Sequence, residues 1–270
     1  MSSTKIYTWW WSNKYIENLP FENFGDILAK YLVEKLSGKE AVYIDPRTQR
    51  WYDLRKVNIV TGSVIRFATW KCNVWGAGII RRNEHIMRTN IFAVRGPLTL
   101  RRLGELGIKV SPAMGDPALL LPRVFNPEQT KKYKVGIIPH YIDIENFEER
   151  FQENDEVCVI DMRCGIEDVI SKINSCEKTI SSSLHGLIVS HAYNIPSVRV
   201  ETENKIVGDG VKYDDYFGSV NIESYNPFIL DDVESDIMNL SFWEKHQKKA
   251  TINKSLDRIN DELLAACPFI

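Results

Sequence analysis

Thr179-Ile-Ser-Ser-Ser-Leu-His-Gly-Leu-Ile-Val-Ser-His-Ala-Tyr-Asn-Ile-Pro-Ser-Val-Arg-Val-Glu201 is the stretch that decides the fold expected for this chain. A short β-favouring run at 178–181 is followed by a serine-rich turn and then by apolar residues at helical spacing. Asn194-Ile-Pro196 predicts the end of that helix, and Ser197-Val-Arg-Val200 predicts the next strand. A strand–helix–strand unit of this kind indicates an α/β protein with a parallel sheet.

His185 lies at the predicted strand-to-helix junction of this unit. Ligands of open α/β sheets bind where the carboxyl ends of strands meet helix N-termini, and the free N–H groups there favour anions. His185, with Ser182, Ser183, Leu184 and Gly186, is therefore a candidate site for a phosphate or a carboxylate. The alternative is that the serines cap the helix and that His185 is a buried histidine bonded to a backbone carbonyl.

The composition indicates an ordinary globular protein that is long enough for two lobes. The 270 residues are 44% hydrophobic and 26% charged, and the net charge of −2 gives no reason to expect nucleic-acid binding. The cysteines lack the paired spacing of a zinc site, so we expect free thiols in a reducing cytoplasm and no metal. They are Cys72, Cys158, Cys164, Cys176 and Cys267.

We expect a cytoplasmic protein, because the run at 6–11 is too short and too aromatic for a signal peptide and no apolar run is long enough to span a bilayer. Trp9, Trp10 and Trp11 are predicted to lie in a core strand. The alternative is peripheral contact of these residues with the inner face of a membrane, and Phe242 and Trp243 in the last helical segment offer a second surface for such contact.

The remaining pattern alternates strands and helices in two series. The first series predicts strands at 5–11, 41–44, 56–63, 72–80 and 90–94 and helices at 23–36 and 98–106. A polar segment at 126–132 is interpreted as a linker. The second series predicts strands at 133–140, 156–161 and near 219–221, a helix at 166–176, and mostly helix at 234–266.

This pattern predicts two Rossmann-like lobes that face each other across a cleft. Residues 1–125 form the N-terminal lobe and residues 132–230 the C-terminal lobe, while the helices of 231–270 pack back across both. Neither a G-x-G-x-x-G fingerprint nor a P-loop is present, so nicotinamide, flavin and ATP binding lack their usual signatures. Glycines after strands still let a ligand approach the backbone closely, with ordinary turn formation as the alternative.

Five short motifs follow one another along the chain. They are Asn23-Phe-Gly-Asp26, Gly76-Ala-Gly78, Ala93-Val-Arg-Gly-Pro-Leu98, Met114-Gly-Asp-Pro-Ala118 and Ser182-Ser-Leu-His-Gly-Leu187. In this order and spacing they resemble the polysaccharide pyruvyltransferase family over roughly residues 23–199. The resemblance implies a GT-B-like fold and a donor substrate, phosphoenolpyruvate, with no cofactor. It implies transfer of the enolpyruvyl moiety onto two hydroxyls of a sugar, which gives a pyruvate ketal and phosphate.

The acceptor implied by this resemblance is a capsule, exopolysaccharide or cell-wall glycan, or its lipid-linked oligosaccharide precursor. The first lobe would take the acceptor and the second lobe the donor. The sequence leaves open the acceptor sugar and the oligomeric state. Candidates for a sugar-stacking platform are Trp9, Trp10, Trp11, Trp51, Trp70 and Trp75, with core packing as the alternative.

The resemblance also implies that His185 and Arg95 are the donor-site pair. A guanidinium suits the carboxylate and phosphate of phosphoenolpyruvate, which makes Arg95 the predicted anion clamp. Histidine titrates near neutral pH, so His185 is either the acid and base or a phosphate contact, and both roles stay open. Asp26 is the third catalytic candidate, as a proton acceptor beside the sugar, with helix capping as the alternative.

The remaining candidate substrate-binding residues lie at predicted loop or strand ends. They are Asn23, Gly25, Gly76, Gly78, Asp116 and His140. A turn-forming role is the alternative for Asp116, and His191 is predicted to pack in the interior.

Two other functions are considered beside pyruvyl transfer. One is a GT-B-type glycosyltransferase that uses a nucleotide sugar. The other is an inactive glycan-binding protein, which would not depend on His185.

Overall fold

The first six strands form one parallel sheet in a computed structural model that describes residues 4–128, 130–201 and 209–270. The order of the strands is β2-β1-β3-β4-β5-β6. Their bounds are β1 (Lys5–Trp9), β2 (Glu40–Tyr43), β3 (Val57–Ile59), β4 (Cys72–Trp75), β5 (Asn90–Val94) and β6 (Ala113–Met114). Because β1 lies between β2 and β3, the connections diverge at the β1/β3 pair, which is the position where such sheets bind ligands.

The remaining strands form a second parallel sheet in the order β11-β10-β9-β7-β8. Their bounds are β7 (Tyr133–Ile138), β8 (Val157–Val159), β9 (Cys176–Ser181), β10 (Ser197–Glu201) and β11 (Phe228–Ile229). Counted from β7, the order repeats that of the first sheet, and the corresponding point of divergence is the β7/β9 pair. The α/β class and the two parallel sheets predicted from sequence are confirmed; the limits of the two lobes as domains stay a prediction.

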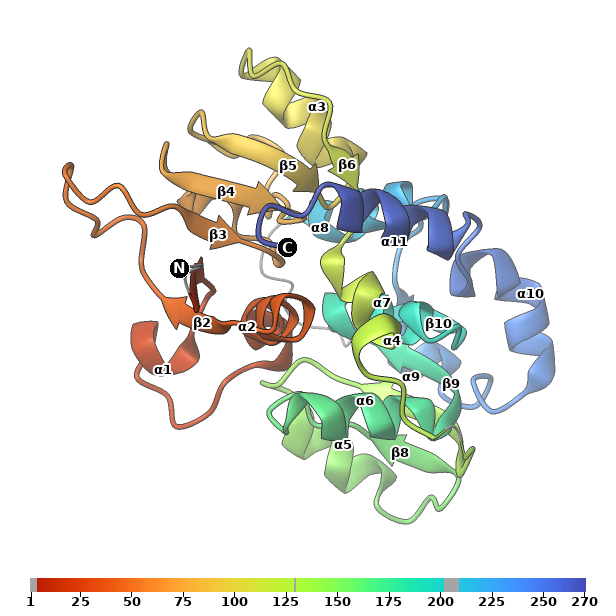
Figure 1. The fold of residues 1–270 in the computed structure, drawn as a ribbon. Helices are drawn as coiled ribbons and strands as arrows, with labels where there is room; N and C mark the ends of the chain where they lie inside the picture. The colour runs from red at the N-terminus through yellow and green to blue at the C-terminus, as the bar shows by residue number, and fades with distance from the viewer. Residues whose placement is uncertain (1–3, 129, 202–208) are drawn as a thin grey trace.

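Helices connect the strands and cover the sheets (Figure 1). In the first half they are α1 (Asn13–Ile16), α2 (Phe24–Ser37), η1 (Ile65–Phe67), α3 (Pro97–Glu105), η2 (Pro117–Leu120) and α4 (Leu121–Val124). In the second half they are α5 (Ile144–Phe151), α6 (Ile166–Asn174), α7 (Leu184–Ala192), α8 (Val211–Ser219) and α9 (Leu230–Val233). The helix expected at 23–36 is α2, which ends where Gly38 adopts a left-handed conformation with φ 67°.

The strand predicted near residues 219–221 is wrong. Ser219 is the last residue of α8, and the Val220 amide donates to the Phe217 carbonyl to close the helix end. Asn221 then takes a left-handed conformation with φ 58°, which turns the chain and is incompatible with an extended strand. The apolar residues there are buried at the end of α8. The last strand of the second sheet is β11 instead.

The C-terminal helices α10 (Leu240–Ala250) and α11 (Leu256–Ala265) run from the second sheet back to the first (Figure 1). Trp75 at the end of β4 donates its Nε1–H to the Leu263 carbonyl at 2.9 Å. Phe269 packs edge-on against the same indole, with ring centroids 5.3 Å apart. A fully buried tryptophan of the first sheet therefore anchors the end of the chain.

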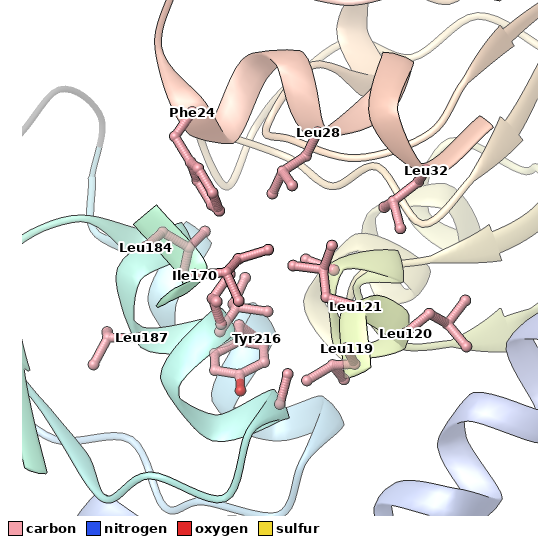
Figure 2. Packing of buried hydrophobic residues seen from close by; sticks show 14 of the residues in the cluster. Phe24, Leu28, Leu32, Leu119, Leu120, Leu121, Ile170, Leu184, Leu187 and Tyr216 are labelled. Carbon is pink, nitrogen blue, oxygen red and sulfur yellow. The ribbon is translucent and has the colours of Figure 1, made fainter. Parts of the chain in front are cut away.

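One hydrophobic cluster connects the two sheets (Figure 2). Phe24, Leu28 and Leu32, from one face of α2, are fully buried in it. They meet residues of η2, α6, α7 and α8, and Figure 2 shows these side chains gathered between the helices. The shared core fixes the position of α2 against the second sheet, and α2 carries two of the candidate site residues at its start.

The tryptophans differ in exposure: Trp51 and Trp70 are exposed, and Trp11 is half-buried. Trp9, Trp10 and Trp75 are buried, as are Phe242 and Trp243 of α10. The core role predicted for Trp9 and Trp10 is therefore confirmed, and neither they nor the α10 aromatics offer a face to a membrane. In the described residues, no helix is long and apolar enough to cross a bilayer.

Leu28→Ala tests the shared core. Removing a fully buried leucine should lower the free energy of unfolding by about 2–5 kcal/mol, because the surroundings fill the cavity only in part. Urea denaturation followed by near-UV circular dichroism measures this loss. Leu240→Ala, at an exposed position of α10, serves as the control and should change the midpoint little. A Leu28→Ala midpoint equal to that of the control would contradict the assignment of a common core.

Candidate active site

A pocket of about 300 Å³ lies at the carboxyl ends of both sheets. Trp11 follows β1, and Gly62 and Ser63 follow β3. His140 follows β7, and the Ser183–His185 segment follows β9. The pocket therefore lies at the strand divergence points of both sheets, where helix N-termini and loop amides converge. Its volume is at the lower end of the range of small-molecule sites.

His185, the second residue of α7, faces the pocket with its side chain 11% exposed. Its Nε2 lies 3.3 Å from Thr61 Oγ1, and that hydroxyl donates to Asp116 Oδ1 at 2.9 Å. Because the threonine proton is used on Asp116, the threonine oxygen accepts from His185, which assigns the imidazole proton to Nε2. Thr61, itself bonded to Asp116, thus holds the His185 ring in one orientation.

Asp116 has one carboxylate oxygen without a hydrogen bond to any described residue. Its Oδ1 accepts from Thr61 and from the Ala118 amide, whereas Oδ2 is buried and lies 4.0 Å from His185 Nε2. The turn-forming role considered for Asp116 is present, since it caps η2. The unpartnered oxygen favours a second role, which is to stabilise a positive charge on the imidazole.

Burial lowers the pKa of His185, and the positive charges of Arg95 and Lys212 lower it further, whereas Asp116 raises it. The ring is therefore neutral at neutral pH when the pocket holds no anion. A bound anion would offset the nearby positive charges and raise the pKa of His185 again. The protonation state of this histidine is thus linked to the ligand.

Gly25 makes room for His185. A Cβ at position 25 would lie 2.1 Å from His185 Nδ1, so every other residue type would displace the ring. Gly25 is in the first turn of α2, and α2 packs against α7 in the shared core. The glycine of the Asn23-Phe-Gly-Asp26 motif is therefore needed for close contact with the imidazole and does not itself line the pocket.

The N-terminus of α7 faces the pocket. Ser183 is its N-cap without a side-chain capping bond, and the first backbone bond inside the helix is from the Leu187 amide to the Ser183 carbonyl. The amides of Leu184, His185 and Gly186 precede that bond and are the free donors of the helix start. Ser183 and Leu184 line the pocket, so an anion there meets both the dipole and the imidazole.

Asp26 lines the pocket on the α2 side, and the pKa of its carboxyl group is raised. Burial, with a smaller contribution from the charges of Glu22 and Glu17, raises its pKa to about 7. The opposing influences are the hydrogen bond from Asn23 Nδ2, 2.7 Å long, and the charge of Lys212. A carboxyl group that is half protonated at neutral pH can both give and accept a proton.

Lys212, Arg66 and His140 complete the polar part of the wall. Burial lowers the pKa of Lys212 to about 8, and the charges of Arg95 and Arg199 contribute to the shift. Lys212 is still mostly cationic at neutral pH, so it attracts an anion. Burial also lowers the pKa of His140, which leaves this second histidine neutral.

Arg95 is fully buried and does not line the pocket. Its Nε donates to Asp215 of α8 at 3.1 Å, Nη1 to Ser63 Oγ at 2.6 Å and Nη2 to the Ile79 carbonyl at 2.6 Å. With each of these nitrogens engaged, the geometry does not support the direct anion clamp predicted for Arg95. The residue acts on the pocket through its partners, because Ser63 lines the wall and Asp215 lies one turn after Lys212.

The glycine motifs pack against one another. A Cβ at Gly78 would lie 2.5 Å from Arg95 Cζ, and one at Gly76, whose φ is 94°, would lie 2.0 Å from Pro117 Cδ. A Cβ at Gly96 would lie 1.7 Å from the Asp215 carbonyl oxygen. Gly76 and Gly78 were predicted to contact the substrate, but neither lines the pocket. Gly78 packs closely against the Arg95 guanidinium, and Gly76 packs against Pro117, next to Asp116.

Of the predicted site residues, those that line the pocket are Asn23, Asp26, His140, Ser183, Leu184 and His185. Those that support the pocket from behind are Gly25, Gly76, Gly78, Arg95, Asp116, Ser182 and Gly186. Ser182, for example, accepts from the His140 amide and, through its carbonyl, from Tyr213 of α8. Gly186 allows α7 to approach Ser181 and Ile138 of the sheet.

Sequence reasoning missed Lys212, Ser63 and Arg66. The Thr61-Gly62-Ser63 turn after a predicted strand was a usable signal for Ser63. Lys212 stands in no recognisable motif, and only the packing of α8 brings it to the pocket. The interior role predicted for His191 is confirmed, since it is buried between Tyr216 OH and the Ser197 carbonyl.

The fold and the pocket define an α/β protein with two parallel sheets and one pocket lined by residues from both halves of the chain. A sequence profile of the family described as polysaccharide pyruvyl transferase matches residues 23–204. The chain therefore belongs to the polysaccharide pyruvyl transferase family, and it is a transferase with a polysaccharide acceptor.

Two relatives are similar over most of the chain. A protein of Acanthamoeba polyphaga mimivirus, described as uncharacterized, is 30% identical over 209 residues, which are 74% of this chain and 72% of the relative. The succinoglycan biosynthesis protein ExoV of Rhizobium meliloti (strain 1021) is 29% identical over 232 residues, which are 82% of this chain and 69% of the relative.

Gly25→Ala tests the contact between α2 and the imidazole. The added methyl group would collide with His185 Nδ1, so we expect a loss of about 1–3 kcal/mol in the free energy of unfolding and a shifted imidazole signal in NMR spectra. Gly104→Ala is the matched control, because a Cβ there meets nothing within 4 Å and alanine favours the helix. An unshifted signal in a fully stable Gly25→Ala protein would refute the contact.

Asp26→Asn tests the raised pKa of this carboxyl group. Since the folded pKa of about 7 exceeds the ordinary value of 3.8, the folded state binds the extra proton between these values. The wild type should therefore lose stability, relative to the Asn variant, as pH rises from about 4 to about 7, by on the order of 2–4 kcal/mol. Urea denaturation across that pH range measures the difference. Parallel profiles for both proteins would show that the group titrates normally.

Proposed function

We propose that this chain transfers the enolpyruvyl group of phosphoenolpyruvate onto two hydroxyls of a sugar, with formation of a cyclic pyruvate ketal and release of phosphate. The observation that carries the proposal is one pocket that combines anion-binding groups with a carboxyl group that titrates near pH 7. Family membership supports the reaction type, and the pocket supports the identity of the donor.

The second-sheet side of the pocket suits the donor. The free amides at the start of α7, the imidazole of His185 and the ammonium of Lys212 offer donors and positive charge to a phosphate or carboxylate. Arg66 lies at the first-sheet wall, with its guanidinium over the Phe67 ring. These groups replace Arg95 in our assignment of the anion-binding residues.

The reaction requires a proton donor and then two proton acceptors. Protonation of the methylene carbon of phosphoenolpyruvate leaves a cationic centre at C2, and the first sugar hydroxyl adds there and gives up its proton. Cleavage of the bond between C2 and the phosphate oxygen releases phosphate and restores the electrophile. The second hydroxyl then closes the ketal and loses its proton. One proton enters at carbon and two leave oxygen, so one is released with the phosphate.

We assign the proton transfers to Asp26. A carboxyl group with a pKa of about 7 holds a proton for the methylene carbon and, once ionised, accepts one from a hydroxyl. We assign His185 to the donor phosphate, because it lines the pocket at the start of α7, beside the free amides of the helix. A bound phosphate would raise the pKa of His185 and turn the ring into a charged partner, which Asp116 would stabilise.

The first-sheet side of the pocket suits the acceptor. Trp11 and Phe67, whose ring centroids are 5.5 Å apart, lie there beside Tyr141 from the second half, and aromatic faces of this kind accommodate sugar rings. Acceptor and donor on facing lobes correspond to the GT-B arrangement. We place the reaction on the cytoplasmic side, on a lipid-linked precursor of a capsule, exopolysaccharide or cell-wall glycan.

The volume of the pocket distinguishes this proposal from a nucleotide-sugar glycosyltransferase. About 300 Å³ suits phosphoenolpyruvate beside one sugar ring better than it suits a nucleotide sugar in addition. Acceptor-dependent transfer from a nucleotide sugar, without phosphate release from phosphoenolpyruvate, would favour the glycosyltransferase.

His185→Ala and Lys212→Met test the donor site. Phosphate release from phosphoenolpyruvate, measured over a panel of sugar and oligosaccharide acceptors, should fall about 10²- to 10³-fold in His185→Ala, because the imidazolium charge that stabilises the bound phosphate is lost. Lys212→Met should mainly raise KM for phosphoenolpyruvate, because it removes attraction for the bound anion.

His85→Ala and Lys30→Met are the controls, since both side chains are exposed and outside the pocket. They should turn over like the wild type. Calorimetric binding of phosphoenolpyruvate separates a missing acceptor from a wrong donor. A wild-type protein that neither binds nor turns over phosphoenolpyruvate would overturn the proposal.

A further inference from the structure

The connection between β2 and β3 projects from the first sheet as a long loop (Figure 1). The Asp53 amide donates to the Arg50 carbonyl at 2.9 Å, so Trp51 and Tyr52 are the central residues of a turn at its tip. Trp51 is 83% exposed and Leu54, one residue past the turn, is 75% exposed. Large apolar side chains are thus exposed at the tip of this loop.

The tip is held in a defined shape. Lys71 Nζ, itself buried, donates to the Arg50 carbonyl at 2.6 Å, and Gln49 Nε2 donates to the Arg55 carbonyl at 3.0 Å. Lys71 Nζ also lies 4.9 Å from the centre of the Trp70 ring, which is 54% exposed. Trp70 therefore shares the surface of Trp51 although 19 positions separate them in sequence.

Positive charge surrounds these aromatic side chains. Residues 44–56 contain four basic and two acidic side chains. The two acids, Asp45 and Asp53, pair with Arg47 and Arg55. Within the described ranges, no carboxylate pairs with Arg50, and Lys56 lies 5.9 Å over the Trp70 ring. The surplus charge is therefore available to an external anionic surface.

We propose that the tip formed by Trp51, Tyr52, Leu54 and Trp70, with Arg50 and Lys56 beside it, binds the surface of an anionic lipid bilayer. Tryptophan and tyrosine favour the boundary between headgroups and acyl chains, and basic residues are attracted by anionic headgroups. A surface that combines exposed indoles with unpaired basic groups matches a lipid bilayer in both respects. The test must distinguish a lipid bilayer from two other occupants of the tip, a protein partner and a second copy of this chain.

The base of the loop reaches the candidate active site. The Arg47 guanidinium lies 4.9 Å over the ring of Phe67, which lines the pocket. A tip bound to a bilayer would hold the pocket beside the lipid headgroups. The placement of the pocket beside the headgroups matters only if the acceptor is lipid-linked, so it rests on the proposed function. The binding of the tip to lipid does not depend on that function.

Vesicle sedimentation with the full chain tests the proposal. The wild type should bind phosphatidylcholine vesicles that contain phosphatidylglycerol, and binding should weaken without phosphatidylglycerol or at high salt. The double variant Trp51→Ser, Leu54→Ser should lose binding. The double variant Arg50→Gln, Lys56→Gln should bind about 25-fold more weakly, since each basic side chain near an anionic surface contributes about fivefold.

Matched controls use residues far from the tip. Leu240→Ser removes an exposed apolar side chain, and Lys245→Gln, Lys248→Gln removes two exposed charges of α10. Both should bind vesicles like the wild type. Wild-type protein that ignores anionic vesicles, or tip variants that bind as well as the controls, would overturn the proposal.

Two further measurements separate the alternatives. Sedimentation velocity without vesicles would reveal a second copy as the occupant if the wild type were a dimer and the Trp51 variant a monomer, which would also overturn the lipid assignment. Phosphate release with a water-soluble acceptor should be equal in the wild type and the tip variants. Since vesicle binding needs no phosphoenolpyruvate, failure of the donor assay would leave the lipid result standing.

Discussion

The buried ion pair between Arg95 and Asp215 connects the chemistry of the pocket to the fold. Arg95 follows β5 of the first sheet, and Asp215 lies in α8, between two strands of the second. Asp215 also accepts from the amide and hydroxyl of Thr99 in α3, so α8 is fixed to the first sheet. Removing one partner of such a pair leaves an uncompensated buried charge, which costs about 3–5 kcal/mol.

This pair positions groups that touch the pocket. Lys212 precedes Asp215 by one turn of α8, and Ser63 accepts from the same guanidinium. Gly78 and Gly96 are the glycines that permit the approach, because any side chain at either would collide with Arg95 or Asp215. These glycine motifs pack against each other, and the residues that line the pocket lie elsewhere in the chain.

The second constraint is the close packing of α2 against α7. Phe24, Leu28 and Leu32 bury themselves in a core shared with the second sheet, which brings Gly25 against the His185 ring and Asp26 to the pocket wall (Figure 2). The same burial raises the pKa of Asp26 to about 7 and lowers the pKa of His185. The packing that stabilises the two-sheet structure therefore also sets the acidity of its candidate catalytic groups.

The sequence by itself determined the α/β class, the alternation of strands and helices, and the place of His185 at a strand-to-helix junction, because hydrophobic periodicity and turn residues act locally. It also indicated Asp26 and His140, which follow predicted loops or strands. Only the tertiary structure decided that Arg95 is buried, that Asp116 faces His185 and that Lys212 enters the pocket. Those facts depend on contacts between distant segments, such as Arg95 with Asp215 and Asp116 with His185, which no local pattern encodes.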